Sequence, residues 1–531
     1  MQNCRRWCTR GFVESAVATA ASLIATIPAV AATLTIGLNV SPSSMDPHFH
    51  YVGQNTGPLS HVFEPLIAQQ PDFSLGPRLA TSWHAVDDRT WEFRLRAGVK
   101  FHDGSDFTAE DVQFSLHRVP LVPNSPNSFA LYTKNIESVT IVDSLTLRIT
   151  TKTPDPEFPV SMSQILVMSH VAGGGSAPEG KTTQELNAGQ GMVGTGPYRF
   201  VEFVSGDRMT VTANPTYWGG APTWERVVMK IITADASRSA AMLSGDLDAT
   251  ELPGESLAPL KEDPKFRVIL GASCLISYLA LDQHDHSPKV TDTDGKNPLQ
   301  DARVRAALSY AINRGAIAER IMLGMADPAA ELGPPTLFGA MPDAKPDLYD
   351  PDKAKQLLAE AGYAGGFGLT LESPRGLFPR DSEMAQAIAA MWTRVGVRTA
   401  VEAVPGTMFY SRRNQLQYSA YVTNMCAYNG QLSYSLRILA MTQDIPKGNG
   451  GINYSGYSNP EVDRLIAESL HTLNDDARRA LVHQASEIVM HRDHAVLSII
   501  RLRTAYVSRQ TLVVVPRLDN FLTAMQVTPA Q

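Results

Sequence analysis

The stretch WEFRLRAGVKFHDGSDFTAEDVQFSLHR, residues 91–118, carries the signals of a strand, a tight turn and a helix in immediate succession. Apolar and polar residues alternate in WEFRLRAG, which predicts a strand. HDGS predicts a tight turn between a strand that ends at Phe101 and the following helix, because Gly104 is free to adopt a positive φ. Thr108, with Asp111 three residues later, has the pattern of a capping box and predicts the start of the helix.

Local structure also accounts for the charged side chains of this stretch. Glu110 and Asp111 fall in the first turn of the predicted helix, where the helix dipole favours negative charge. The two histidines and the carboxylates belong to a turn and a helix start, not to a metal-ligand spacing. We therefore interpret the stretch as structural, not as a metal site. The apolar stripe of the predicted helix consists of Val112, Leu116 and Val119.

The rest of the chain divides into a strand-rich first half and a helix-rich second half. From Asp301 onward apolar residues recur at helical spacing, as in DARVRAALSYAINR. YDPDKAKQLLAEAGY has Asp350 as a cap and Gly362 for a left-handed exit, and SNPEVDRLI begins with Asn459 in the same way. EMAQAIAAMWTRVGV stops at Gly396. The pattern predicts a compact mixed α/β protein.

The first residues have the pattern of a secretory signal peptide. Arginines precede an apolar run and the small residues PAVAA, so we expect residues 1–32 to be removed and the mature protein to be periplasmic. Cys4 and Cys8 lie ahead of the apolar run, which argues against a lipoprotein. Cys274 and Cys426 then remain, enough for one disulfide, although the sequence leaves their pairing open.

Length and charge narrow the classes of partner. About 500 residues after the predicted cleavage correspond to roughly three domains. The formal net charge is −7 and there is no basic stripe, which argues against nucleic acid and anionic membranes as partners.

Several motifs, in order, resemble one family over almost the whole mature chain. W-x-F-x-L-R-x-G-V-K-F-H-D-G-x-x-F-T-A-x-D-V-x-F-S runs from 91 to 115. It is followed by GTGPYRFVEF from 194, NPTYWGG from 214, RVRAALSYAINR from 303, YDPDKAKQLLAEAGY from 349 and YSNPEVDRLI from 457. Together they resemble the extracytoplasmic solute-binding proteins of ABC importers, in the peptide/nickel family, family 5.

The resemblance implies an α/β, two-lobed periplasmic-binding-protein fold of the large type II cluster, with a hinge and an extra inserted domain. Lobe one would comprise 33–75, 190–285 and 501–531, the inserted domain 76–189, and lobe two 286–500. The implied function is capture of a small solute, peptide-like or another small organic molecule, in an interlobe cleft and its delivery to an ABC permease and ATPase. We expect a monomer with no catalytic residue, no metal ligand and no cofactor.

The resemblance also nominates residues that contact the solute. They are His50 and Tyr51 in MDPHFHYVGQ, Ser128 and Phe129 in the inserted domain, Arg375 in ESPRGLFPRD, and Met425, Cys426, Tyr428 and Asn429 in TNMCAYNGQLS. Peptide-binding relatives commonly carry an aspartate in the last of these segments, and residues 423–433 contain no acid. A buried ammonium without a counter-charge is costly, so we expect a neutral or multifunctional solute rather than an ordinary peptide with a free amino terminus.

Two alternatives stay open at this level. One is an exported hydrolase, although no nucleophile, base and orienting group emerge from the motifs. The other is a binding protein for a metal chelate such as nickel, since HFH at 48–50, His61 and DQHDH at 282–286 supply ligand types. Short histidine spacings in loops are frequent, and we do not predict a direct metal site.

Overall fold

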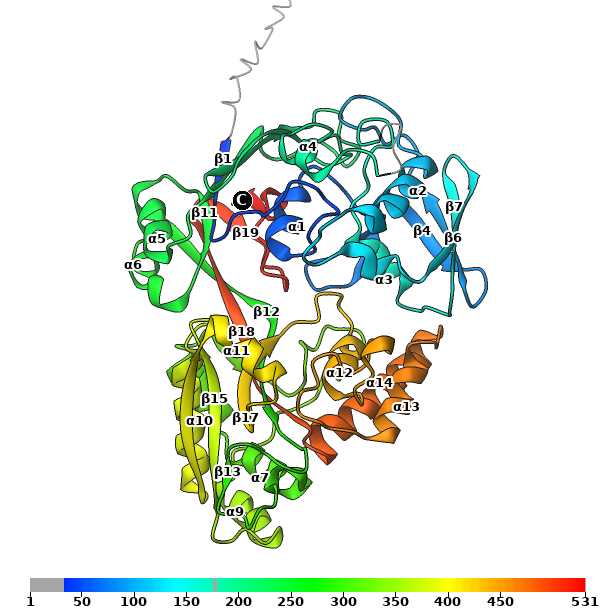
Figure 1. Cartoon of the computed structure of the whole chain (residues 1–531). Coiled ribbons are helices and arrows are strands. Elements are labelled where there is room, and N and C mark those ends of the chain that lie inside the picture. Colours follow the sequence, from blue (N-terminus) through cyan, green and yellow to red (C-terminus); the bar gives the residue numbers. More distant parts are fainter. Residues whose placement is uncertain (1–32, 175–178, 531) are drawn as a thin grey trace, which may run out of the picture.

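The computed structural model describes residues 33–174 and 179–530, and in it the chain forms two lobes, one above the other in Figure 1. We call them the upper and the lower lobe. The predicted signal peptide lies outside the described residues. Among the described residues, no helix is both long and apolar enough to cross a membrane.

A twelve-stranded sheet runs through both lobes. Its spine is the antiparallel pair of two long strands, β12 (Phe266–Leu281) and β18 (Val496–Arg509), which cross the waist of the molecule (Figure 1). The register of this pair breaks between Ala272 and Ile276. Such an irregularity disrupts the ladder locally and bends the strands, which makes this point the natural hinge.

The upper lobe surrounds one half of this sheet. β1 pairs in parallel with β10 and β11, so the carboxyl ends of these strands point the same way. The elements are β1 (Thr33–Leu38), β8 (Tyr198–Val204), β9 (Arg208–Ala213), β10 (Arg226–Ile231), β11 (Ala249–Leu252), α1 (Gly53–Leu59), α4 (Thr183–Asn187), α5 (Asp235–Ser244), α6 (Ala258–Lys261), and the short pairs β2 (Ile67–Gln69) with β3 (Leu75–Pro77) and β19 (Leu512–Val514) with β20 (Val527–Pro529).

A separate four-stranded sheet forms the right side of the upper lobe in Figure 1, and residues 91–118 lie in it and in the helix that follows. The predicted capping box is confirmed, because Asp111 accepts the Thr108 N–H at 2.8 Å and the Thr108 side chain accepts that of Glu110 at 3.3 Å. The predicted end of the strand is wrong: β5 stops at Leu95, since the backbone turns at Gly98 with φ of 75°. The elements are β4 (Ala80–Ala85), β5 (Thr90–Leu95), β6 (Ile136–Asp143), β7 (Thr146–Thr151), α2 (Ala109–Arg118) and α3 (Phe158–Gln164).

The lower lobe has helices on both faces of its part of the large sheet. Alternation along β17 explains this, because Ala420 and Val422 pack in one hydrophobic cluster, with α7, α9 and α10, while Tyr421 and Met425 pack in another, with α12, α13 and α14. The elements are β13 (Val290–Thr291), β14 (Ala326–Pro328), β15 (Phe367–Arg375), β16 (Val397–Pro405), β17 (Ala420–Met425), α7 (Ala302–Tyr310), α8 (Arg314–Ala316), α9 (Pro351–Glu360), α10 (Asp381–Arg394), α11 (Gly406–Asn414), α12 (Leu432–Ala440), α13 (Pro460–Ser469) and α14 (Asp475–Glu487).

Candidate functional site

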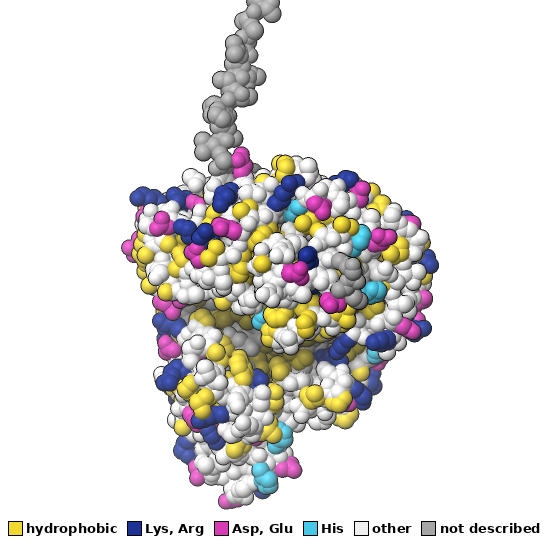
Figure 2. Space-filling model, turned by 45° about the horizontal axis from the view of Figure 1, so that its top comes forward, with side chains coloured by type: hydrophobic (Ala, Val, Ile, Leu, Met, Phe, Trp, Pro, Cys, Tyr) yellow, Lys and Arg dark blue, Asp and Glu magenta, His cyan; other side chains and the backbone are white. Residues whose placement is uncertain are grey.

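A cavity of about 970 Å³ lies between the two lobes, against the hinge strands. We call it the cleft. β1, β11 and β15 all end at it, since Leu38, Leu252 and Arg375 are among its lining residues. The crevice outside the carboxyl ends of parallel strands is the usual binding place in open α/β sheets. Figure 2 shows the hollow between the lobes, with hydrophobic side chains exposed inside it.

The cleft has an apolar lining with charged groups on both walls. The size and the character are those of a site that buries a small organic solute and orients it with a few polar contacts. The apolar residues of the upper wall and hinge are Leu38, Val40, Val52, Pro58, Leu252, Pro253, Leu275, Met325, Leu502, Phe521 and Leu522, and those of the lower wall are Met322, Leu377, Phe378, Pro379 and Tyr428.

The loop between β15 and α10 forms much of the lower wall and is held in shape by Asp381. The carboxylate of Asp381 accepts the backbone N–H groups of Leu377 at 3.0 Å and Phe378 at 3.3 Å. Arg375, the last residue of β15, is exposed where this loop begins. The loop also presents Arg380, which has a left-handed φ of 53° and whose buried Nε has no hydrogen-bond partner among the described residues.

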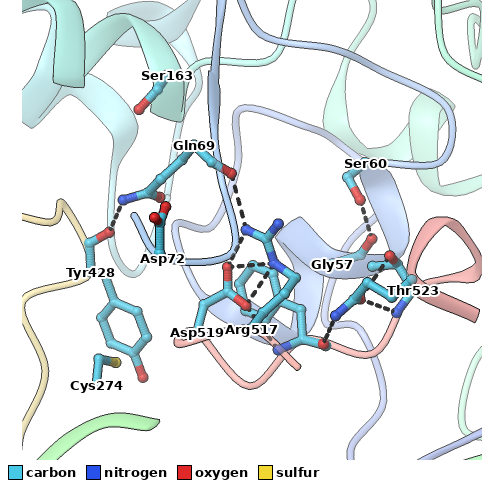
Figure 3. Close-up of polar contacts among 12 residues, drawn as sticks. Gly57, Ser60, Gln69, Asp72, Ser163, Cys274, Tyr428, Arg517, Asp519 and Thr523 are labelled. Atoms are coloured by element: carbon cyan, nitrogen blue, oxygen red, sulfur yellow. Dashed lines mark hydrogen bonds and ion pairs between the residues drawn. The ribbon is translucent and has the colours of Figure 1, made fainter. Parts of the chain in front are cut away.

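A second lower-wall loop carries Tyr428, and a disulfide anchors it. Cys274 of hinge strand β12 is bonded to Cys426, with Cα atoms 5.1 Å apart, which answers the pairing that the sequence left open. Gln69 of the upper lobe donates from Nε2 to the Tyr428 carbonyl at 2.8 Å (Figure 3). The Tyr428 side chain is 42% exposed and lines the cleft.

The lobes also touch beside the cleft, through Glu157 at the start of α3. Ser433 of the lower lobe donates to Glu157 Oε1 at 2.5 Å, and Arg478 Nη1 lies 3.9 Å from the same oxygen. Burial raises the pKa of the Glu157 carboxyl, against the opposing effect of Ser433 and Arg478. Phe73, at the tip between β2 and β3, completes this contact by packing into the hydrophobic cluster of the lower lobe.

Of the residues nominated from the sequence, Arg375 and Tyr428 line the cleft. His50 Nδ1 forms a hydrogen bond with Ser43 Oγ at 2.9 Å. Ser128 Oγ accepts a hydrogen bond from the Ala130 N–H at 3.1 Å. Neither is among the lining residues of the cleft.

The remaining nominated residues lie in packed or turn positions. Tyr51 packs edge-on against Phe129, with ring centroids 5.2 Å apart, and burial raises the pKa of the Tyr51 hydroxyl to about 12. Phe129 and Met425 are buried in hydrophobic clusters. Asn429 Oδ1 accepts the Gln431 N–H at 3.2 Å and so shapes its own turn.

Sequence reasoning missed most of the upper wall, including Glu251 of β11. This carboxylate lines the cleft, and burial raises its pKa to about 7, only partly offset by Arg238. No local sequence signal points to Glu251, because only the structure shows that the other residues of its strand, ATEL, are buried.

Two of the histidines that suggested metal binding, His48 and His61, are engaged inside the upper lobe. His48 contacts the Leu166 carbonyl through Nε2 at 2.7 Å and Arg118 through Nδ1 at 3.1 Å. His61 contacts the Pro58 carbonyl through Nδ1 at 2.9 Å and accepts the Ala524 N–H at Nε2 at 3.0 Å. With both ring nitrogens occupied, neither histidine is free to ligate a metal.

A serine, an aspartate and a histidine meet in the lower lobe, but not in the order of a catalytic triad. Ser309 donates to Asp347 Oδ2 at 2.6 Å, and His494 Nε2 lies 3.2 Å from the same oxygen. A triad requires the histidine between the hydroxyl and the carboxylate. Here Asp347 is the central acceptor, and both Ser309 and His494 are buried.

The chain matches the family model for bacterial extracellular solute-binding proteins, family 5, over residues 74–446, more than half of its length. It is 30% identical to Heme-binding protein A of Haemophilus influenzae over 435 residues, which are 78% of this chain and 76% of the relative. It is 28% identical to the glutathione-binding protein GsiB of Salmonella typhimurium over 478 residues, 88% and 89% of the two chains.

Among solved structures, MppA, a periplasmic murein tripeptide binding protein in an unliganded open form, superposes with a TM-score of 0.79 at 23% identity and covers 94% of this chain and 97% of its own. This likeness shows the two-lobed fold. The relatives are solute-binding proteins, which fits the binding function and not the exported hydrolase. The chain belongs to family 5 of the bacterial extracellular solute-binding proteins, the substrate-binding components of ABC transporters.

Proposed function

We propose that the protein captures a small organic solute in the cleft, closes around it, and delivers it unchanged to an ABC permease and ATPase complex. The cleft is the observation that carries this proposal. It lies between two lobes joined by the long pair β12 and β18, whose register breaks at the waist. A solute that touches both walls binds the closed arrangement better than the open one and so shifts the population toward closure.

The domain division expected from the family is part of the proposal. The separate four-stranded sheet lies within 76–189 and supports an inserted domain there. The last strands, β19 and β20, pack with β1 in one upper-lobe cluster and support the return of 501–531 to lobe one. We further propose that the protein is exported through its signal peptide, without a lipid anchor, and acts as a periplasmic monomer without catalytic activity.

The solute would be a compact organic molecule with polar groups, and Arg375 and Tyr428 would contact it. The names of the relatives specify heme, glutathione and a murein tripeptide, which supports this class of solute without specifying a particular compound for this chain. A volume of about 970 Å³ accommodates a molecule of that size.

The test is to purify the protein natively, release its contents under denaturing conditions and identify them by mass spectrometry. The proposal predicts a stoichiometric small organic solute that raises the melting temperature when it is added back. It also predicts that the solute is recovered chemically unchanged after prolonged incubation. Conversion of the solute into a product would contradict the proposal.

A further inference from the structure

Half of the charged side chains that line the cleft already have partners within the protein. A charge that is already paired within the protein binds a solute weakly, so the charged side chains without a partner are the better candidates for solute binding. The neutralised groups are Arg238, paired with Asp235; Arg503, paired with Asp327 at 2.5 Å; Asp519, paired with Arg517 at 2.6 Å (Figure 3); and Asp381, which accepts backbone N–H groups.

Among the described residues, the lining charges without an ion pair are divided between the walls. The upper wall has Glu251 and the exposed Glu255, while the lower wall has Arg375 and Arg380. Glu383, also without an ion pair, lies on the exposed first turn of α10, where the helix dipole stabilises a carboxylate. Apart from Glu383, the charges without an ion pair are therefore acidic on the upper wall and basic on the lower wall.

Glu251 differs from the other acids because it is partly buried and the donor side chains next to it already form hydrogen bonds with other groups. Arg238 of α5 donates to the carbonyls of Ile232 at 2.7 Å and of Glu251 itself at 3.4 Å, and to Asp235. Tyr506, its cross-strand neighbour on β18, donates to a carbonyl at 3.3 Å. The Glu251 carboxylate thus faces the cleft with no donor among the described side chains, an arrangement that is unfavourable for an ionised group until a cation arrives.

We propose, on the basis of the function proposed above, that Glu251 is the cation-recognition group of the cleft, and that the solute is amphoteric, with an ammonium at Glu251 and an anionic group at the loop 375–383. The acid missing from residues 423–433 is thereby supplied from the opposite wall. A primary ammonium fits best, since it is compact and offers three donors to one carboxylate.

The test uses calorimetric titration of the tripeptide leucyl-alanyl-phenylalanine, its N-acetyl derivative and its C-terminal amide, with glutarate and maltotriose as solutes that lack a cation. The proteins are the wild type, Glu251→Gln, and the control Glu262→Gln, an exposed carboxylate of the upper lobe outside the cleft. A melting curve of each protein verifies its fold.

We expect the wild type and Glu262→Gln to bind the free tripeptide at least tenfold more tightly than the N-acetyl form. Glu251→Gln should bind the two forms within about twofold of each other. Because the pKa of free Glu251 is about 7, wild-type affinity for the free tripeptide should fall about tenfold or more from pH 7.5 to 5.5, and Glu251→Gln should lose this dependence.

Equal binding of the free and acetylated peptides by the wild type would overturn the inference, as would unchanged discrimination in Glu251→Gln. Binding of glutarate or maltotriose without binding of the free tripeptide would also overturn it, while the proposed capture function would stand. A wild type that binds none of these solutes and carries none after purification would overturn both.

Discussion

Replacing Glu251 by Gln should stabilise the solute-free protein at pH 8 and leave its stability at pH 5 nearly unchanged. Burial raises the pKa of this carboxyl from 4.5 to about 7. Between these two values the folded state holds a proton that the unfolded state has released, so stability falls as pH rises through the window and stays constant above it. Gln has the shape of the protonated form and no charge to lose.

The size of the effect follows from the same interval. At 1.36 kcal/mol per pKa unit, a rise from 4.5 to about 7 corresponds to about 3 kcal/mol as an upper limit. Because Glu251 is only partly buried and borders an open cleft, solvent screening lowers the expected gain to about 1–2 kcal/mol. For a lobe of this size, that is a rise of about 2–6 °C in the melting temperature.

The assay is a pair of calorimetric melts of protein stripped of solute, at pH 5 and pH 8, for the wild type, Glu251→Gln and the control Glu262→Gln. The difference between Glu251→Gln and the wild type should grow with pH, and that of the control should not. A difference that is the same at both pH values, or a wild type that is more stable than Glu251→Gln at pH 8, would mean that burial does not raise the pKa of Glu251.

Three further changes test other parts of the structure. Replacing both Cys274 and Cys426 by Ser should cost about 2–5 kcal/mol of unfolding free energy, because the bond closes a segment of 152 residues; urea unfolding that is unaffected by the change would contradict the disulfide. Glu157→Ala should weaken solute binding about three- to tenfold, because it removes charge-assisted contacts between the lobes to Ser433 and Arg478. Calorimetric titration measures this affinity. Unchanged affinity would mean that closure does not depend on the Glu157 contacts. Arg375→Ala and Tyr428→Ala should each lower affinity with little change in melting temperature, since both side chains are exposed in the cleft; unchanged affinity in both would argue against these contacts.

Local signals in the sequence predicted individual elements well. Asp350 accepts the Lys353 N–H at 2.9 Å and caps α9, and Gly362, with φ of 92°, ends it. Asn459 caps α13 in the same way. Capping and left-handed exits depend on a few neighbouring residues, which is why the sequence is sufficient for them.

The cleft was harder to predict because distant segments build it. Glu251 faces Tyr506 across a strand pair, and Cys274 meets Cys426 across 152 residues. No local pattern encodes such pairings. Arg375 and Tyr428 were accessible through the resemblance alone, whereas Glu251 required the register of β11 to be known.

Closure of the lobes around a solute can be measured directly by the distance between two spin labels. Cysteines at Val142 of the upper lobe and Leu348 of the lower lobe, both at least half exposed, would carry the labels. If the lobes close around the solute, the distance distribution of solute-free protein shifts to shorter values when the co-purified solute is restored. A distribution that stays the same at saturating solute would contradict capture by closure.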